Sequence, residues 1–208
     1  MNQFHIAKPA IVFDFGGVLL DWNPRHLYRK LFHDDVIAME RFITEIGFAE
    51  WNAQQDKGRS MAQGVIELSR QFPQYASLIK AYDERWEESV AGPIQPTVDI
   101  LHLLKQRGYP LYALSNWSAE TFQRVRNKYS FFDWFEAIVL SGEVKLIKPD
   151  PLIFLVFLER TRQTAEACLL IDDSEANIAA ARQMGFQAIR FESAGQLREE
   201  LIQRGLLT

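Results

Sequence analysis

Hydrophobic and polar positions follow two different patterns along the chain. Residues 10–20 form an apolar run typical of a buried strand, and Gly16 and Gly17 interrupt it. From about residue 23 to residue 91 the apolar positions recur at helical spacing, and many of them are large aromatics. Gly92 and Pro93 then end this helical stretch. The pattern predicts one strand followed by a block of helices.

Beyond residue 93, short apolar strands alternate with helices that carry capping residues. We predict strands at residues 111–114, 137–140, 168–171 and 187–191, and helices from Thr97 to Gly108, after Ser118, from Asp150-Pro151, through residues 179–181 to Gly185, and over 193–204. This alternation favours a parallel sheet covered on both faces. The predicted fold class is α/β: a doubly wound, mainly parallel, Rossmann-like core (residues 1–21 and 93–208) with an inserted α-helical cap (residues 22–92).

Composition narrows the possible partners. The chain has 208 residues, of which 48 % are hydrophobic, and 23 basic against 27 acidic residues give a net charge of −4. This balance argues against a nucleic-acid partner. The first apolar run contains Asp14 and the run at residues 152–158 is too short to span a bilayer, so we expect no membrane partner and no secretory signal. A single cysteine, Cys168, fits a reducing compartment, and we expect a cytoplasmic protein.

The first two polar clusters lie where predicted strands end. Asp14 ends an apolar strand, where a half-buried carboxylate needs a partner or a metal, and the glycines after it let the backbone approach a ligand. Ser115 and Asn116 follow the second core strand, and Ser115 can donate to a phosphoryl oxygen. Taken alone, Asp14 could be a turn residue, and Ser115 and Asn116 ordinary helix caps.

Two further clusters complete the set. Lys148 directly precedes Pro149-Asp150-Pro151, a rigid helix start that would hold its ammonium group in place to neutralise a carboxylate and a phosphoryl group. Asp172 and Asp173 end another apolar strand, and two adjacent acids there favour a cation between them. Hard oxygen ligands of this kind suit Mg²⁺. The alternatives are a solvated surface lysine and a doubly acidic helix cap.

The four clusters follow one another along the chain as Asp14, Ser115-Asn116, Lys148 and Asp172-Asp173, each after its own strand. In this arrangement the sequence resembles the haloacid dehalogenase-like hydrolase superfamily. The resemblance runs from about Ile11 to Phe191 and includes the stretches at residues 129–133 and 148–151. The position of the helical insert resembles the type 1 cap of that superfamily. Within it, residues 14–18 are most similar to a bacterial group that includes sugar-1-phosphate phosphatases, among them glucose-1-phosphate phosphatases.

The resemblance implies a Mg²⁺-dependent phosphatase of small phosphorylated metabolites. Asp14 would attack phosphorus and form an aspartyl-phosphate that water hydrolyses. Mg²⁺ would be held by Asp14, Asp173 and the Gly16 carbonyl, with Asp172 as a ligand or as support for one. Ser115 and Lys148 would bind the remaining phosphate charge together with Gly17 and Asn116, and Asn177 would support the metal ligands. The acceptor, water or another metabolite, and the oligomeric state, monomer or homodimer, stay open.

One position departs from the family pattern. Most phosphatases of the family carry a second Asp where this chain has Gly16, and that Asp protonates the leaving oxygen and later activates water. General acid–base catalysis is worth about 10²–10⁴-fold. Three explanations stay open: a substrate with a good leaving group, which we favour; a substitute acid, Asp21 or Asp56, of which Asp21 is the first to test; or a slow enzyme.

The same departure admits other functions. The 2-haloacid dehalogenases of the family also lack the second Asp and attack carbon, although they need no metal and keep no acid pair like Asp172-Asp173. A catalytically weak binding or regulatory protein is the third possibility. In the cap, the polar stretch from Glu50 to Arg59 is the candidate for a loop that selects substrate, with Trp51 in the pocket; a plain surface turn is the alternative. Residues 21–25 are expected to be flexible and to open and close the site.

Overall fold

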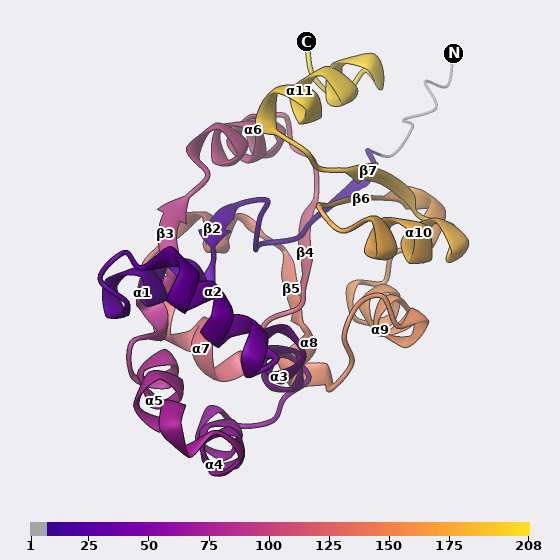
Figure 1. Ribbon diagram of the computed structural model, residues 1–208. Coiled ribbons are helices and arrows are strands. Elements are labelled where there is room, and N and C mark those ends of the chain that lie inside the picture. The colour runs from indigo at the N-terminus through magenta and orange to yellow at the C-terminus, as the bar shows by residue number, and fades with distance from the viewer. Residues whose placement is uncertain (1–7) are drawn as a thin grey trace, which may run out of the picture.

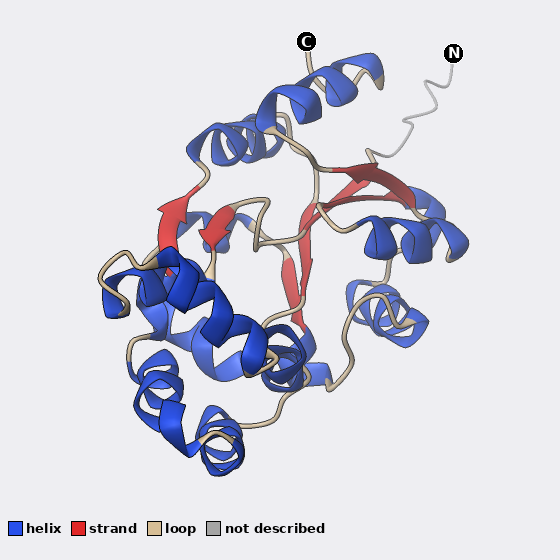
Figure 2. Cartoon of the chain, in the orientation of Figure 1, coloured by secondary structure: helices blue, strands red, loops and turns tan. Residues whose placement is uncertain are grey.

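Strand β1 (Ala10–Phe13) lies at the centre of a five-stranded parallel sheet in the computed structural model, which describes residues 8–208 (Figure 1, Figure 2). The strand order is β5-β4-β1-β6-β7. The other four strands are β4 (Leu111–Ser115), β5 (Ala137–Leu140), β6 (Cys168–Asp172) and β7 (Gln187–Arg190). All residues of β1, β4 and β6 are buried, which explains their continuous apolar runs.

Helices cover both faces of the sheet, as predicted. On one face Val12 of β1 packs with Phe157 of α9 (Pro151–Thr161) and Ile178 of α10 (Glu175–Gln183). On the other face Phe13 shares its apolar cluster with Leu101 of α6 (Gln95–Gln106), and α11 (Ala194–Gln203) lies against α6 (Figure 1). The doubly wound α/β fold is therefore confirmed.

The helical insert is joined to the sheet by a short two-stranded ribbon that the sequence pattern did not reveal. Strands β2 (Leu20–Trp22) and β3 (Val90–Pro93) pair antiparallel, with an irregularity between Asp21 and Trp22. Asn23 also bonds across the ribbon, because its N–H donates to the Ser89 carbonyl at 2.8 Å. Residues 21–25, expected to be flexible, thus belong to β2 and to the start of α1.

The cap lies between these two strands. Its helices are α1 (Pro24–Leu31), α2 (Val36–Glu45), α3 (Phe48–Asp56), α4 (Met61–Gln71) and α5 (Ala76–Glu84), with 3₁₀ turns η1 (Pro73–Tyr75) and η2 (Trp86–Ser89). The core adds α7 (Ala119–Val125), α8 (Ser141–Val144), η3 (Ser130–Trp134) and η4 (Ala165–Ala167). In residues 8–208 no helix is both long and apolar enough to cross a bilayer.

Helix boundaries differ from the prediction at one clear place. Helix α6 begins at Gln95, two residues before the expected cap Thr97. Pro96 occupies the first turn, where its missing N–H costs nothing, and Thr97 is fully buried within the helix. Asp150, by contrast, caps α9 as predicted: its Oδ1 accepts a hydrogen bond from the Leu152 N–H at 2.9 Å.

The polar stretch from Glu50 to Arg59 is not a loop over most of its length, because α3 continues to Asp56. Two of its polar side chains, Asn52 and Gln55, face inward, whereas Glu50, Gln54 and Lys57 are exposed. Gln55 is fully buried and donates to the Trp51 carbonyl at 2.7 Å, and a Cβ on Gly64 of α4 would come within 2.7 Å of Gln55 Oε1. Glycine at position 64 therefore lets α4 pack closely on a polar face of α3, a pattern that hydrophobic periodicity alone does not show.

Candidate active site

The predicted polar clusters meet at one edge of the sheet. Asp14 follows β1, Ser115 ends β4 and Asp172 ends β6. Because β1 pairs in parallel with β4 on one side and β6 on the other, the three carboxyl ends are adjacent. Lys148 reaches the same point from the segment that precedes α9.

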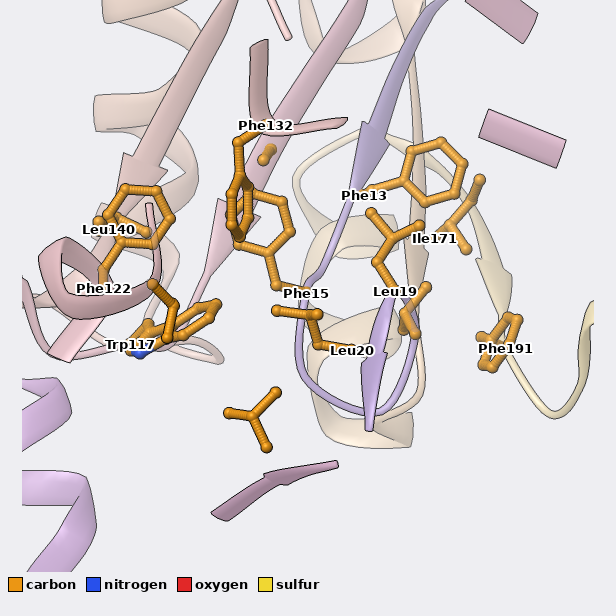
Figure 3. Close-up of a cluster of buried hydrophobic side chains, with 14 of the residues drawn as sticks. Phe13, Phe15, Leu19, Leu20, Trp117, Phe122, Phe132, Leu140, Ile171 and Phe191 are labelled. Atoms are coloured by element: carbon orange, nitrogen blue, oxygen red, sulfur yellow. The ribbon is translucent and has the colours of Figure 1, made fainter. Parts of the chain in front are cut away.

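The backbone fixes Asp14 from both sides. Its N–H donates to the Ile171 carbonyl of β6 at 2.9 Å, and its carboxylate Oδ1 accepts from the Phe15 N–H at 2.7 Å. The ring of Phe15 is fully buried beside Phe132, with centroids 5.0 Å apart, and beside Trp117 at 5.9 Å (Figure 3). Aromatic packing of Phe15 thus anchors the residue that follows Asp14, while Asp14 itself is 7 % exposed.

Lys148 is a buried cation with three acceptors. Its Nζ lies 2.6 Å from Asp172 Oδ2, 2.7 Å from the Leu114 carbonyl and 3.1 Å from Asp14 Oδ2. Its backbone is held in turn by Asn116, whose Oδ1 accepts from the Lys148 N–H at 2.8 Å and whose Nδ2 donates to the Lys148 carbonyl at 2.9 Å. Asn116 therefore positions the lysine, and the lysine links two strand ends.

The two adjacent acids have different surroundings. Asp172 is fully buried, and its oxygens also accept hydrogen bonds from Asn177 Nδ2 at 3.0 and 3.1 Å and from the Ser174 N–H at 2.9 Å. Asp173 is exposed, and its Oδ2 lies so close to Gly17 that a Cβ there would overlap it. Gly17 also has φ +72°, a left-handed conformation that favours glycine.

Negative charge exceeds positive charge in this cluster. Burial raises the pKa of Asp14 to about 6; Lys148 opposes the rise and Asp172 adds to it. Partial desolvation by its neighbours raises the pKa of Asp173 although the residue is exposed, and the charge of Asp172 contributes. Burial works against the charged form of Lys148, yet the two carboxylates raise its pKa overall. One oxygen each of Asp14, Asp172 and Asp173 lie within 4.8 Å of one another, a set of hard ligands that suits a divalent cation.

A cavity of about 50 Å³ adjoins Gly16 and Ser115. It is lined by Gly16, Leu20, Trp22, Asn52, Asp56, Met61, Trp86, Ser115, Asn116, Trp117, Ser118 and Thr121. These residues come from the core, the ribbon and the cap, so the cavity lies between core and cap. Among the described residues that line it, none is basic and most of the lining surface is apolar.

Two of the residues expected at the site lie elsewhere. Trp51 is buried in the cap, where its Nε1 donates to the Gly64 carbonyl at 3.0 Å, and it does not line the cavity. The Asp21 side chain is 52 % exposed and its Oδ1 lies 2.9 Å from His26 Nε2, again away from the cavity lining. The other predicted residues meet around Asp14.

The residues that the sequence interpretation missed are mostly aromatic or apolar: Trp22, Met61 and Trp86 line the cavity. Trp22 carried a usable signal, because Leu20 and Trp22 lie two apart on a strand and so share a face, opposite to Asp21. That signal depends on assigning β2 as a strand.

A family model described as haloacid dehalogenase-like hydrolase matches residues 8–185. The chain belongs to this family of hydrolases. The resemblance inferred from the order of the four polar clusters is thereby confirmed.

Relatives within the family include phosphatases. A sesquiterpene phosphatase of Aspergillus oryzae is 27 % identical over 182 residues, covering 85 % of this chain and 86 % of that protein. A phosphorylated carbohydrates phosphatase of Thermotoga maritima is 24 % identical, covering 86 % and 83 %. The magnesium complex of a haloacid dehalogenase family enzyme from Bacteroides thetaiotaomicron superimposes with a TM-score of 0.72 and 26 % identity, covering 95 % and 99 %. The chain is thus a hydrolase with phosphatases among its relatives, which supports a phosphoric monoester phosphatase.

Proposed function

We propose that the protein is a Mg²⁺-dependent phosphatase of small phosphorylated metabolites. In this proposal Asp14 is the nucleophile and is transiently phosphorylated. One observation carries the proposal: the Lys148 ammonium group joins Asp14 to Asp172, beside Asp173, at adjacent strand ends. A buried nucleophilic carboxylate, a cation for phosphate oxygens and a set of metal ligands are the parts that phosphoryl transfer requires.

The residues present fit Mg²⁺. Three carboxylates face one ammonium group, so a bound divalent cation would offset the excess negative charge. Asp14, Asp173 and the Gly16 carbonyl would hold it, while Asp172, already bonded to Lys148 and Asn177, would support the arrangement. When bound, Mg²⁺ neutralises charge on the transferring phosphoryl group.

The protein groups then have distinct tasks. The Phe15 N–H holds one oxygen of Asp14, which fixes the carboxylate for attack on phosphorus. Lys148 would contact a phosphoryl oxygen while keeping Asp14 ionised, and Ser115 would donate from the end of β4. Cleavage of the ester bond releases the alcohol, and hydrolysis of the aspartyl-phosphate restores the Asp14 carboxylate.

The cavity narrows the substrate class. Three tryptophans, Trp22, Trp86 and Trp117, contribute to its lining, and the one acidic or basic side chain in the described lining is Asp56. An anionic group on the leaving alcohol would meet no cation there and would lose its hydration without forming an ion pair. The organic part of the substrate is therefore uncharged, as in a sugar phosphate or a phosphorylated alcohol.

A phosphate-release assay tests these points together. Hexose phosphates, glycerol phosphate, acyl phosphates and phosphoglycolate are compared with Mg²⁺ and with chelator, for the wild type and Asp14→Asn. We expect Mg²⁺-dependent release that Asp14→Asn abolishes, and kcat/KM at least about tenfold lower for phosphoglycolate because its carboxylate would be desolvated there without a cationic partner. Release that survives Asp14→Asn would contradict the nucleophile, and a preference for phosphoglycolate would contradict the substrate class.

Attack on carbon is the second candidate, favoured by Gly16 alone. The conversion of a 2-haloacid needs no second acid, but its carboxylate also needs a cationic partner, which the described cavity lining lacks. Halide release from 2-haloacids in chelator, with no phosphate release from the panel, would replace the phosphatase proposal. Metabolite binding unaffected by Asp14→Asn, with no turnover of either kind, would instead indicate a binding protein.

A further inference from the structure

Position 16 opens onto empty space. A Cβ on Gly16 would meet no atom within 4 Å, and Gly16 lines the cavity beside Ser115. The φ of Gly16 is not positive, so the backbone itself does not call for glycine there. The place where most family phosphatases project their acid is therefore open in this chain, and any acid must come from another wall of the cavity.

Asp56 occupies such a wall. It is the last residue of α3 in the cap, and it is the one carboxylate among the described residues that line the cavity. Asp21, the other candidate acid, is on the face of β2 opposite to the cavity-lining Leu20 and pairs with His26. Geometry therefore favours Asp56.

Hydrogen bonds hold the Asp56 carboxylate in a defined orientation. Its Oδ1 accepts from the Ser118 N–H of the core at 3.1 Å, and its Oδ2 accepts from Asn52 Nδ2 at 2.8 Å. Asn52 is oriented in turn by Tyr82, whose hydroxyl donates to Asn52 Oδ1 at 3.0 Å. Each carboxylate oxygen keeps a second acceptor position for a proton.

The surroundings also bring the pKa of the Asp56 carboxyl close to neutral pH. Burial raises the pKa of Asp56 to about 7, the Ser118 N–H opposes the rise, and the charge of Asp14 adds to it. Three other titratable side chains lie on the surrounding elements: Tyr82, Glu120 and Lys145. Tyr82 bonds to Asn52, Glu120 accepts from the Met61 N–H, and Lys145 donates to the Gly58 carbonyl. A group with this pKa can both give and take a proton near pH 7.

We propose that Asp56 is the general acid and base of the reaction, supplied by the cap in place of the acid missing at Gly16; this rests on the proposed phosphatase function. As Asp14 bonds to phosphorus, the bond to the leaving oxygen breaks and that oxygen takes the Asp56 proton. In the second step Asp56 takes a proton from water as the water oxygen bonds to phosphorus. The Asp14–phosphorus bond then breaks, which restores the Asp14 carboxylate and the protonated Asp56.

Asp56→Asn tests the acid with two leaving groups. For a hexose 6-phosphate, whose alkoxide leaves poorly, we expect kcat/KM to fall about 10²–10⁴-fold. For p-nitrophenyl phosphate, which needs no acid, the loss is expected to be less than tenfold. The phosphorylated form of Asp14 should then accumulate as a burst of p-nitrophenol, because the base for its hydrolysis is missing. That burst also shows that the variant is folded.

A pH profile gives a second readout. The acid must be protonated when the substrate binds, so kcat/KM of the wild type for the hexose phosphate should fall as the pH rises above about 7. This falling limb should be absent in Asp56→Asn. A limb that persists unchanged in the variant would overturn the assignment.

Rescue at position 16 separates chemistry from packing. A side chain at position 16 meets open space. Gly16→Asp added to Asp56→Asn should therefore raise kcat/KM for the hexose phosphate at least about tenfold above that of Asp56→Asn alone. Asp83→Asn serves as the matched control, because it removes the charge from a different cap–core ion pair, with Arg124 Nη2 at 2.5 Å, away from the cavity. Any loss in Asp83→Asn should be the same for both substrates and should not be rescued.

The outcomes distinguish the two proposals. Equal losses of Asp56→Asn on both substrates, without a burst and without rescue, would overturn the role of Asp56 while wild-type turnover and the Asp14→Asn result uphold the phosphatase. A selective loss in Asp21→Asn, with Asp56→Asn unaffected, would assign the acid to Asp21 instead. Absence of wild-type phosphate release from every substrate would overturn both.

Discussion

At the scale of single residues, the site depends on how closely side chains approach the backbone. Gly17 has a left-handed φ of +72°, and a Cβ on it would overlap Asp173 Oδ2. Gly16, its neighbour, has neither constraint. The two glycines of this turn therefore have different reasons for being glycine, and substitution should separate them.

Gly17→Ala is expected to destabilise the protein by about 1–2 kcal/mol through backbone strain. It should also raise the Mg²⁺ concentration for half-maximal activity by about 10- to 100-fold, because Asp173 must move away from its position. Urea denaturation and Mg²⁺ titration of activity measure the two effects. Gly16→Ala is the control and should keep wild-type stability within about 1 kcal/mol; equal destabilisation by both changes would contradict this account.

The residues of the site were also the part most open to prediction from sequence. Asp14, Ser115, Lys148 and Asp172 each directly follow or end an apolar run, or precede a rigid helix start, so their chain order was informative. The choice between Asp21 and Asp56 was not, because it depends on how the insert folds back over the sheet.

At the scale of elements, the end of α3 is where the cap meets the core. Ser141 Oγ donates to the Asp56 carbonyl at 2.5 Å, and Lys145 Nζ donates to the Gly58 carbonyl at 3.0 Å. Gly58 has φ +95°, and a Cβ on it would overlap the Lys145 side chain and lie 2.8 Å from the Gly142 carbonyl. The turn after α3 therefore approaches α8 as closely as the backbone allows.

Gly58→Ala should hinder closure of the cap over the site, because the added methyl group holds α3 away from α8. We expect kcat/KM for the preferred substrate to fall at least about tenfold. Gly205→Ala is the matched control: its φ of +71° carries similar strain, about 1–2 kcal/mol, but its Cβ would meet no atom within 4 Å. Steady-state kinetics decide, and equal activity of the two variants would show that this contact has no part in closure.

Strands that are buried along their whole length could be predicted from the sequence. Strands that exist only through hydrogen bonding to a distant segment could not. Strands β1, β4 and β6 are buried throughout, so continuous apolar runs revealed them, and Asp150 revealed the start of α9. Strands β2 and β3 have three and four residues and carry Asp21, Gly92 and Pro93. Such strands are defined by hydrogen bonding to each other, which is not visible in either segment alone.

At the scale of the whole molecule, excess charge is gathered at one edge of an otherwise apolar core. Three carboxylates gather at the ends of adjacent strands, and Lys148 pairs with two of them, Asp14 and Asp172. A cation bound there would stabilise the folded chain, because the unfolded chain has no such cluster.

Mg²⁺ at about 100 times its dissociation constant is expected to stabilise the protein by about 2.7 kcal/mol. For a chain of this length that is a rise in Tm of about 5–10 °C, reversed by chelator. Calorimetry of the wild type and of Asp173→Asn, which should lose most of the shift, measures it. The same Tm in Mg²⁺ and in chelator would contradict the metal site.

The position of Asp56 at the end of α3 has a consequence for how such an enzyme can diversify. The proposed nucleophile and metal ligands lie at the ends of sheet strands, whereas the proposed acid belongs to the inserted segment, which also lines the cavity. Sequence change in the insert therefore alters selectivity and proton transfer together. A chimaera that receives this insert on another sheet would inherit its acid, and a chimaera that loses it would keep only the chemistry of good leaving groups.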